Sequence, residues 1–115
     1  MPPEDRNTAY LWDLVQTSRE ILAFVEGKTF KDYAQDRMLQ MATERGLQIL
    51  GDAARRLSED FRASHPDIPW SGIIGQRNVV VHDYADLDNV RIWRVLDQDL
   101  PKLLQQIERL LPETP

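Results

Sequence analysis

The sequence predicts an all-α protein, an up-and-down bundle of four or five helices, from three observations. Apolar residues recur at intervals of three and four along most of the 115 residues, which is the spacing of one buried helix face. Proline and glycine separate these stretches and leave only short connections. No segment offers a clear pair of strands. Short loops between amphipathic helices are typical of such a bundle, and we expect residues 1–115 to form a single domain.

The first periodic stretch predicts a helix from Thr8 to about Glu26. Either Asn7 or Thr8 can cap its start, because a short oxygen-bearing side chain accepts hydrogen bonds from the first-turn amides. Gly27 is expected to end it. Its buried face is made of Leu11, Leu14, Val15, Ser18, Ile21, Leu22 and Val25.

A second, longer pattern opens at Asp32 and predicts one helix that continues to Phe61. Its small residues let another helix approach closely, although a glycine inside a helix costs about 1 kcal/mol relative to alanine. Pro66 and Pro69 then end the pattern and impose a short extended connection. The members of this face are Leu39, Ala42, Gly46, Ile49, Leu50, Ala53 and Leu57.

Two further helices are expected before the end of the chain. The third runs from Trp70 to about His82, and its three valines at 79–81 favour a strand only in isolation, since no partner strand is available. The last begins near Val90 and runs to residue 111. Pro101 lies inside it and predicts a kink or break near Leu100.

Composition narrows the classes of function. The chain has no cysteine and two histidines, so it lacks a disulfide framework and a thiolate metal site, and a typical zinc site would need several carboxylates. No apolar run approaches the ~20 residues of a membrane span, and the first residues lack the order of a secretory signal. We expect a cytoplasmic protein without metal or cofactor. Its net charge of −5 weighs against non-specific nucleic-acid binding, so contact with RNA would need a local basic patch or an oligomer.

The chemistry-bearing side chains gather between Arg77 and Tyr84. Arg77 lies on the apolar stripe of the third predicted helix, where a guanidinium is costly unless it is paired, reaches outward or lines a cleft. Asn78 and His82 are four positions apart, hence neighbours on a helix. Asp83 follows His82, and the helix end favours a protonated imidazole there.

These residue types suit phosphodiester chemistry. A guanidinium binds non-bridging phosphate oxygens and stabilises charge in the transition state. A histidine near neutrality takes a proton from a ribose 2′-hydroxyl or gives one to the leaving oxygen, and Asn78 can orient either group. A reaction that uses the 2′-hydroxyl needs no metal and cuts RNA but not DNA.

Structural roles also account for the same residues, and such residues have them more often. Arg77 can form a buried ion pair with Glu44 or Asp52 in a purely structural helical dimer. His82 can simply cap a helix, and Tyr84 can be a core ring with its hydroxyl in water.

The motif resembles the Arg-x4-His-x-Tyr signature of HepT-like proteins, a branch of the HEPN superfamily. The resemblance extends beyond it. Residues 44–54 resemble the long second helix of that family, residues 65–70 the loop before the motif helix, and Trp93 with residues 99–101 its last helix. Asp52 is a mild departure, because the family more often has glutamate there.

This resemblance implies a HEPN-like helical bundle that forms a homodimer with two motifs facing one cleft. It implies a toxin with metal-independent endoribonuclease activity, with Arg77 and His82 as catalytic residues and Asn78 in support. The implied partner is an MntA-type nucleotidyltransferase antitoxin, which transfers AMP from ATP to Tyr84. Arginines that can extend a basic patch around the cleft are Arg55, Arg56, Arg62, Arg91 and Arg94. The alternative is a non-catalytic interaction partner that only presents Tyr84 for modification.

Overall fold

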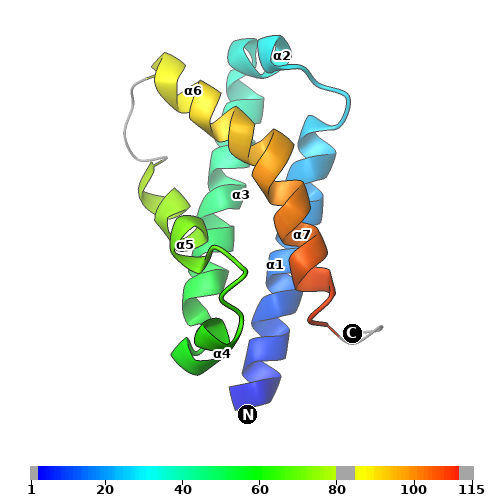
Figure 1. Cartoon of the computed structure of the whole chain (residues 1–115). Helices are drawn as coiled ribbons and strands as arrows, with labels where there is room; N and C mark the ends of the chain where they lie inside the picture. The colour runs from blue at the N-terminus through cyan, green and yellow to red at the C-terminus, as the bar shows by residue number, and fades with distance from the viewer. Residues whose placement is uncertain (1–2, 80–84, 112–115) are drawn as a thin grey trace.

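The computed structural model describes residues 3–79 and 85–111, with side-chain surroundings for 6–75 and 89–111. All the regular elements of the described residues are helical, which confirms the all-α prediction. Figure 1 shows α1 and α3 as the long helices of the bundle, with α7 beside α1, α5 on α3, and α2 and α6 at one end. The elements are α1 (Pro3–Val25), α2 (Phe30–Gln35), α3 (Arg37–Arg56), α4 (Glu59–Ser64), α5 (Trp70–Val79), α6 (Ala85–Arg94), a π-helical turn η1 (Val95–Asp99) and α7 (Leu100–Glu108).

The start of α1 differs from the prediction. The helix begins at Pro3, so Asn7 and Thr8 lie inside it, and the cap predicted there is wrong. A proline is tolerated in a first turn, because the N–H that it lacks would have no partner within the helix. Asn7 instead serves another helix: its Nδ2 donates to Ser58 Oγ at 3.2 Å and its Oδ1 accepts from the Ser58 amide at 3.1 Å. The predicted stop is confirmed, since Gly27 has a φ of +73°, which glycine adopts without strain.

The single long second helix that the pattern predicted is wrong, and its first break is at Asp36. The Asp36 carboxylate accepts from the Leu39 amide at 3.0 Å, so a new helix starts there. Upstream, Thr29 and Asp32 form a reciprocal capping box that begins α2 before the residue expected. Apolar spacing continues through the break because α2 and α3 contribute to one core.

The second break separates α3 from α4 at Leu57. Its side chain is 2% exposed and its backbone is extended, so the chain turns while the apolar contact is kept. Ser58 then caps α4, with its hydroxyl accepting from the Phe61 amide at 3.1 Å.

The close approach predicted from small residues is confirmed at Gly46. A β-carbon built on Gly46 would lie 2.5 Å from Ile21 Cγ1 and 2.7 Å from its Cδ1, inside any normal contact. Ile21 has no exposed surface, so it has little room to move aside. The absent side chain is therefore what lets α1 and α3 pack at this distance.

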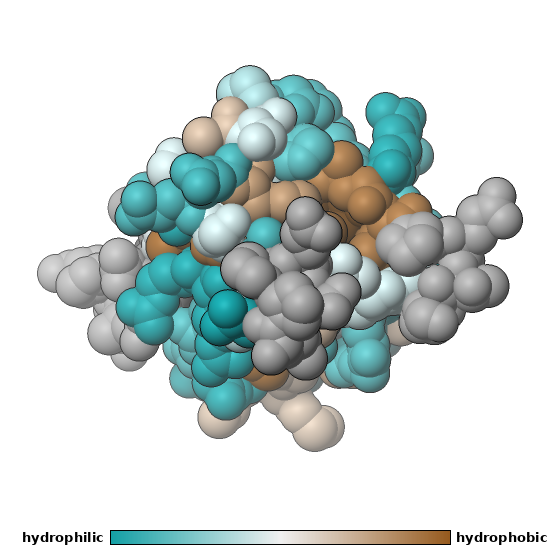
Figure 2. Space-filling view, turned by 90° about the horizontal axis from the view of Figure 1, so that it is seen from below, coloured by the Kyte–Doolittle hydropathy of each residue, from teal (hydrophilic) through white to brown (hydrophobic). Residues whose placement is uncertain are grey.

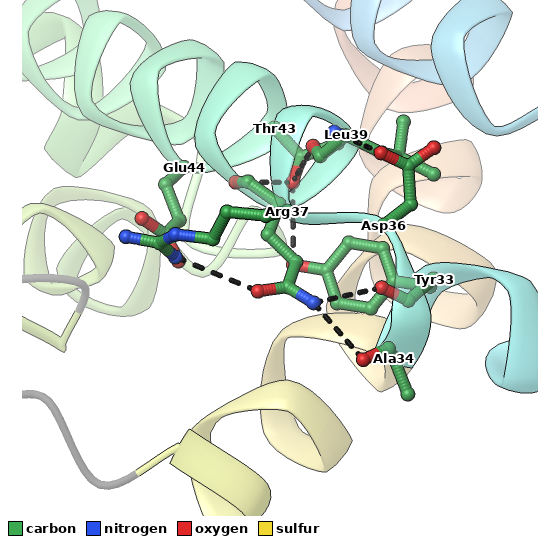
Figure 3. A network of polar contacts seen from close by, with 8 residues as sticks. Tyr33, Ala34, Asp36, Arg37, Leu39, Thr43 and Glu44 are labelled. Carbon is green, nitrogen blue, oxygen red and sulfur yellow. Dashed lines mark hydrogen bonds and ion pairs between the residues drawn. The ribbon is translucent and has the colours of Figure 1, made fainter.

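A polar network ties α2 to α3 (Figure 3), and one aromatic contact ties α2 to α6. The buried Tyr33 hydroxyl is hydrogen-bonded to Thr43 Oγ1 at 3.2 Å. Gln40 Nε2 donates to the backbone carbonyls of Tyr33 at 2.9 Å and Ala34 at 3.2 Å, which caps the end of α2. The ring of Tyr33 lies 5.5 Å from that of Trp93. Burial raises the pKa of the Tyr33 hydroxyl, because the charged phenolate would lose its hydration.

The interruption expected near Leu100 takes the form of η1. The Leu100 amide donates to the carbonyl of Val95, five residues back, so the turn is one residue wider than an α-helical turn. Pro101 has no N–H to donate in an α-helical pattern, and the wider turn precedes it directly. The helix then continues as α7.

At the end of the bundle where α1 begins, the described residues are mostly hydrophilic, with an apolar area gathered in one part (Figure 2). Among the residues that the structure describes, no helix is long and apolar enough to cross a membrane.

We expect Gly46→Ala to lower the free energy of unfolding by about 1–3 kcal/mol, because the added methyl overpacks against Ile21. This loss should appear although alanine is the better helix former. The matched control is Gly75→Ala in α5, where an added β-carbon meets nothing within 4 Å and stability should hold or rise. Urea unfolding followed by circular dichroism measures both, and equal effects of the two changes would contradict the packing explanation.

We expect Tyr33 to ionise at a higher pH than an unburied tyrosine, whose pKa is 10.0. A raised pKa means that the folded protein holds the proton more tightly. The resulting stability is therefore fully present below pH 10 and is lost as pH rises through the folded-state pKa. Absorbance of tyrosinate during an alkaline titration, compared with Tyr33→Phe, should assign a late step to Tyr33 that coincides with loss of helicity. An early step with the helices intact would contradict its burial.

Candidate functional site

Helix α5 carries the first two residues of the predicted site. Arg77 and Asn78 occupy its last turn, at adjacent positions, and their side chains lie outside those that the structure describes. His82 and Tyr84 lie outside the described residues altogether, and α6 begins directly after them at Ala85. The convergence of Arg77 and His82 on one site therefore remains a prediction.

The start of α5 is held firmly against the core. Trp70 and Ile73 are each 8% exposed, as the apolar stripe of this helix predicted. The Trp70 indole donates from Nε1 to the carbonyl of His65 at 3.0 Å, and Gln106 Nε2 of α7 donates to the carbonyl of Asp67 at 3.1 Å. The loop before α5 is thus tied to both its own helix and α7. Because a helix is stiff, this anchoring also limits where Arg77 can lie.

The direction of α5 determines toward which end of the bundle its last turn, with Arg77, points. Gly72 and Ile73 share a hollow of about 330 Å³ with Leu47 and Leu50, in the middle of α3. From there α5 rises away from α4, toward the end of the bundle that holds α2 and α6 (Figure 1). The motif therefore begins in the last turn of a helix that points toward the α2–α6 end.

The two carboxylates that the sequence offered as partners for Arg77 have other arginines nearby. Glu44 Oε1 lies 4.0 Å from Arg37 Nη1, which also donates to Gln40 Oε1 at 3.5 Å (Figure 3). Asp52 lines a groove of about 360 Å³ between α1 and α3, whose walls include Arg45 and Arg56. Neither observation describes the side chain of Arg77.

Arg37 is an exposed arginine that the sequence pattern did not single out. Its guanidinium side chain is 69% exposed on the first turn of α3, whereas that of Glu44 is only 25% exposed. The two are seven positions apart, about two helical turns, and therefore lie on one face. The seven-residue spacing is present in the sequence. However, the apolar pattern predicted one helix over residues 32–61, in which Arg37 does not lie at a helix start.

The five arginines proposed for a basic patch do not form one group. Arg91 and Arg94 are exposed at the end of α6. Arg55 and Arg56 are exposed at the end of α3, and Arg62 is half-buried in α4, which lies toward the other end of the bundle (Figure 1). Within one protomer, α3 is 20 residues, or about 30 Å, long and separates Arg55 and Arg56 from the α6 side. The patch was predicted around a cleft between two protomers, and it stays a prediction.

In the described part of the chain, no group of three or more His, Asp or Glu side chains is placed to hold a metal ion. The chemistry available to the motif residues is that of a guanidinium, an amide, an imidazole and a phenol.

The fold and the motif together define an all-α protein built around an Arg-x4-His-x-Tyr segment, whose first residues end an anchored helix. The family model Ribonuclease HepT-like matches residues 14–110, and the chain belongs to this family. The predicted HepT-like resemblance is thereby confirmed.

Similar proteins carry names of the same kind. The chain is 32% identical over 101 residues to "Probable ribonuclease HepT" of Thermococcus cleftensis, covering 88% of this chain and 92% of that protein. It is 31% identical over 102 residues to "Putative RNase TTE0752" of Caldanaerobacter subterraneus subsp. tengcongensis (89% and 91%). It is 29% identical over 100 residues to "Putative RNase MJ1380" of Methanocaldococcus jannaschii (87% and 92%). No solved structure matches the chain.

Proposed function

We propose that this protein is the toxin of a toxin–antitoxin pair, a metal-independent endoribonuclease that uses Arg77 and His82. The observation that carries the proposal is the Arg-x4-His-x-Tyr segment, whose first residue lies in the last turn of the anchored helix α5, in a chain of the ribonuclease HepT-like family. The relatives named as RNases, each covered over more than nine-tenths of its length, support the same activity.

The proposed reaction is a transesterification within RNA. The ribose 2′-oxygen attacks the neighbouring phosphorus and loses its proton, and the bond from phosphorus to the 5′-oxygen of the next nucleotide breaks as that oxygen gains a proton. His82 takes part in one of these proton transfers. Arg77 binds the non-bridging oxygens and stabilises their growing charge, and Asn78 orients the phosphate or the imidazole.

A homodimer with both motifs at one cleft would ease the conflict with the acidic chain. Each protomer carries a net charge of −5, which repels RNA over most of the surface. Two copies of Arg77 and His82 in one cleft would concentrate positive charge where the phosphate must sit. Arg91 and Arg94 lie on the helix that follows the motif and are the exposed arginines that best suit this role.

Control of the toxin is proposed to act through Tyr84. An MntA-type nucleotidyltransferase antitoxin would transfer AMP from ATP to the tyrosine hydroxyl, with release of pyrophosphate. Tyr84 follows Arg77 by seven positions, so the added phosphate and base would be placed near the site that the RNA phosphate needs. The modification would thus block substrate binding.

We expect the purified, unmodified protein to cleave RNA in the presence of EDTA, and Arg77→Ala or His82→Ala to abolish cleavage. The matched control is His65→Gln, which changes the chain's other histidine, in the loop before α5. The His65 carbonyl, which accepts from Trp70, stays in place in that variant. Gel analysis of a labelled RNA reads out the result. Cleavage that persists in both motif variants would end the catalytic assignment, and an inactive wild type would favour the passive interaction partner.

The effect of Arg77→Ala on the free energy of unfolding distinguishes a catalytic role for Arg77 from a structural one. A catalytic arginine is often unfavourable for folding, so Arg77→Ala should leave the free energy of unfolding nearly unchanged or raise it. A buried ion pair predicts a loss of about 3–5 kcal/mol instead. Denaturant unfolding of the variant and the wild type decides between them.

We expect co-expression with an MntA-type nucleotidyltransferase to add AMP to the protein and to suppress its toxicity. Intact-mass measurement should show a gain of AMP units that Tyr84→Phe removes. Tyr10→Phe is the control, because this half-buried tyrosine of α1 lies outside the motif. AMP retained by Tyr84→Phe would place the modification elsewhere.

A further inference from the structure

A small aromatic hollow lies between α2 and α6, on the helix that follows the motif. Its volume is about 190 Å³. We refer to it as the aromatic hollow. It is lined by Phe30, Val90, Trp93, Arg94, Asp97 and Gln98.

Two of its apolar side chains are exposed to solvent. Phe30 is 39% exposed and Val90 is 50% exposed, whereas the core residues of the same helices are almost fully buried. The rings of Phe30 and Trp93 lie 6.5 Å apart, tilted by 60°. Large apolar side chains kept at the surface mark a contact surface more often than a solitary exposed residue does.

The Trp93 ring of the hollow is packed against a buried residue. The ring of Trp93 lies 5.5 Å from that of Tyr33, which has no exposed surface and is hydrogen-bonded to Thr43. Trp93 is thus held from behind by the α2–α3 network and needs little ordering when something binds in front of it. A preorganised surface of this kind loses less entropy on binding.

The polar lining selects the kind of ligand. Arg94 supplies a guanidinium, Asp97 a carboxylate and Gln98 an amide, so donors and acceptors stand beside the rings. The carboxylate disfavours a free phosphate, and a purely aliphatic ligand would leave the three polar groups unused. A nucleobase fits all of these features, because it stacks on aromatic and guanidinium planes and presents donors and acceptors at its edge.

The place of the hollow in the chain points to the motif. Val90 follows the first residue of α6, Ala85, by five positions, about 7.5 Å along the helix axis, and the motif segment directly precedes that residue. We propose that the aromatic hollow stacks one base of the RNA, at a nucleotide flanking the phosphate that is cleaved. This inference rests on the proposed ribonuclease function and adds to it a subsite for single-stranded RNA.

The test compares Phe30→Ala with Phe24→Ala. Phe24 is a matched control, because it is 43% exposed on α1 and does not line the hollow. A stacking contact corresponds to a factor of about 5 to 150 in binding, so Phe30→Ala should raise KM for a short single-stranded RNA by that factor with kcat little changed. Phe30→Trp should restore KM, which a merely structural role for Phe30 would not predict.

The substrate offers the complementary change. Removing one base at a time from the RNA should reveal one position where the loss raises KM for the wild type but adds nothing in Phe30→Ala. Equal KM values for Phe30→Ala and Phe24→Ala, or base-removal effects that are additive with Phe30→Ala at every position, would overturn the subsite.

Equilibrium binding separates failure of the subsite from failure of the proposed function. An RNA with 2′-deoxyribose throughout its cleavable positions cannot react, and its binding can be followed by quenching of tryptophan fluorescence. In one outcome, the wild type binds this strand tightly, Phe30→Ala binds it more weakly by the same factor, and the wild type cuts no RNA. That outcome supports the subsite and contradicts only the proposed nuclease activity. If the wild type and Phe30→Ala cut RNA with the same KM, that outcome contradicts only the subsite.

Discussion

Where α1 and α3 cross, the missing side chain of Gly46 leaves the space that Ile21 occupies, and the rest of the bundle is built on that contact. A β-carbon there would push apart the two longest helices, whose facing residues form much of the core. Helix α5 packs on α3 and α7 packs on α1. The positions of α5 and α7 therefore depend on how α1 and α3 pack against each other. The placement of Arg77 at the end of α5 thus depends on a glycine far from it in the sequence.

Helix caps divide a continuous apolar pattern into separate helices. Asp36 and Ser58 each accept a backbone hydrogen bond that begins a new helix, and the chain turns before each of them. The break at Asp36 frees α2 to fold over the end of α3, where Tyr33 becomes buried against Trp93. The surface between α2 and α6 exists because of that break. Local polar chemistry therefore shapes the part of the molecule that we assign to base recognition.

The acidic composition of the chain is compatible with RNA binding at a single site. The exposed arginines of the described residues are spread over α1, α3, α6 and the end of α7. Those of α6 accompany the motif, whereas Arg55 and Arg56 lie at the far end of α3. Binding that depends on a few positioned groups, with stacking added to phosphate contacts, relies less on net positive charge than non-specific binding does. This reconciles the acidic composition with the proposed substrate.

The sequence by itself determined the helical class, the glycine stop after α1, the interruption near Pro101 and the motif, because each follows from local backbone chemistry or from the period of apolar residues. It also predicted a close helix approach at its small residues, which the structure confirms at Gly46. Only the tertiary structure decided that Asn7 hydrogen-bonds to Ser58 and that Phe30 contacts Trp93. The cap at Asp36 is local, but the continuous apolar period predicted one helix across it. The period shows which residues share the core, but a side chain can find its partner 51 or more residues away only once the helices have packed.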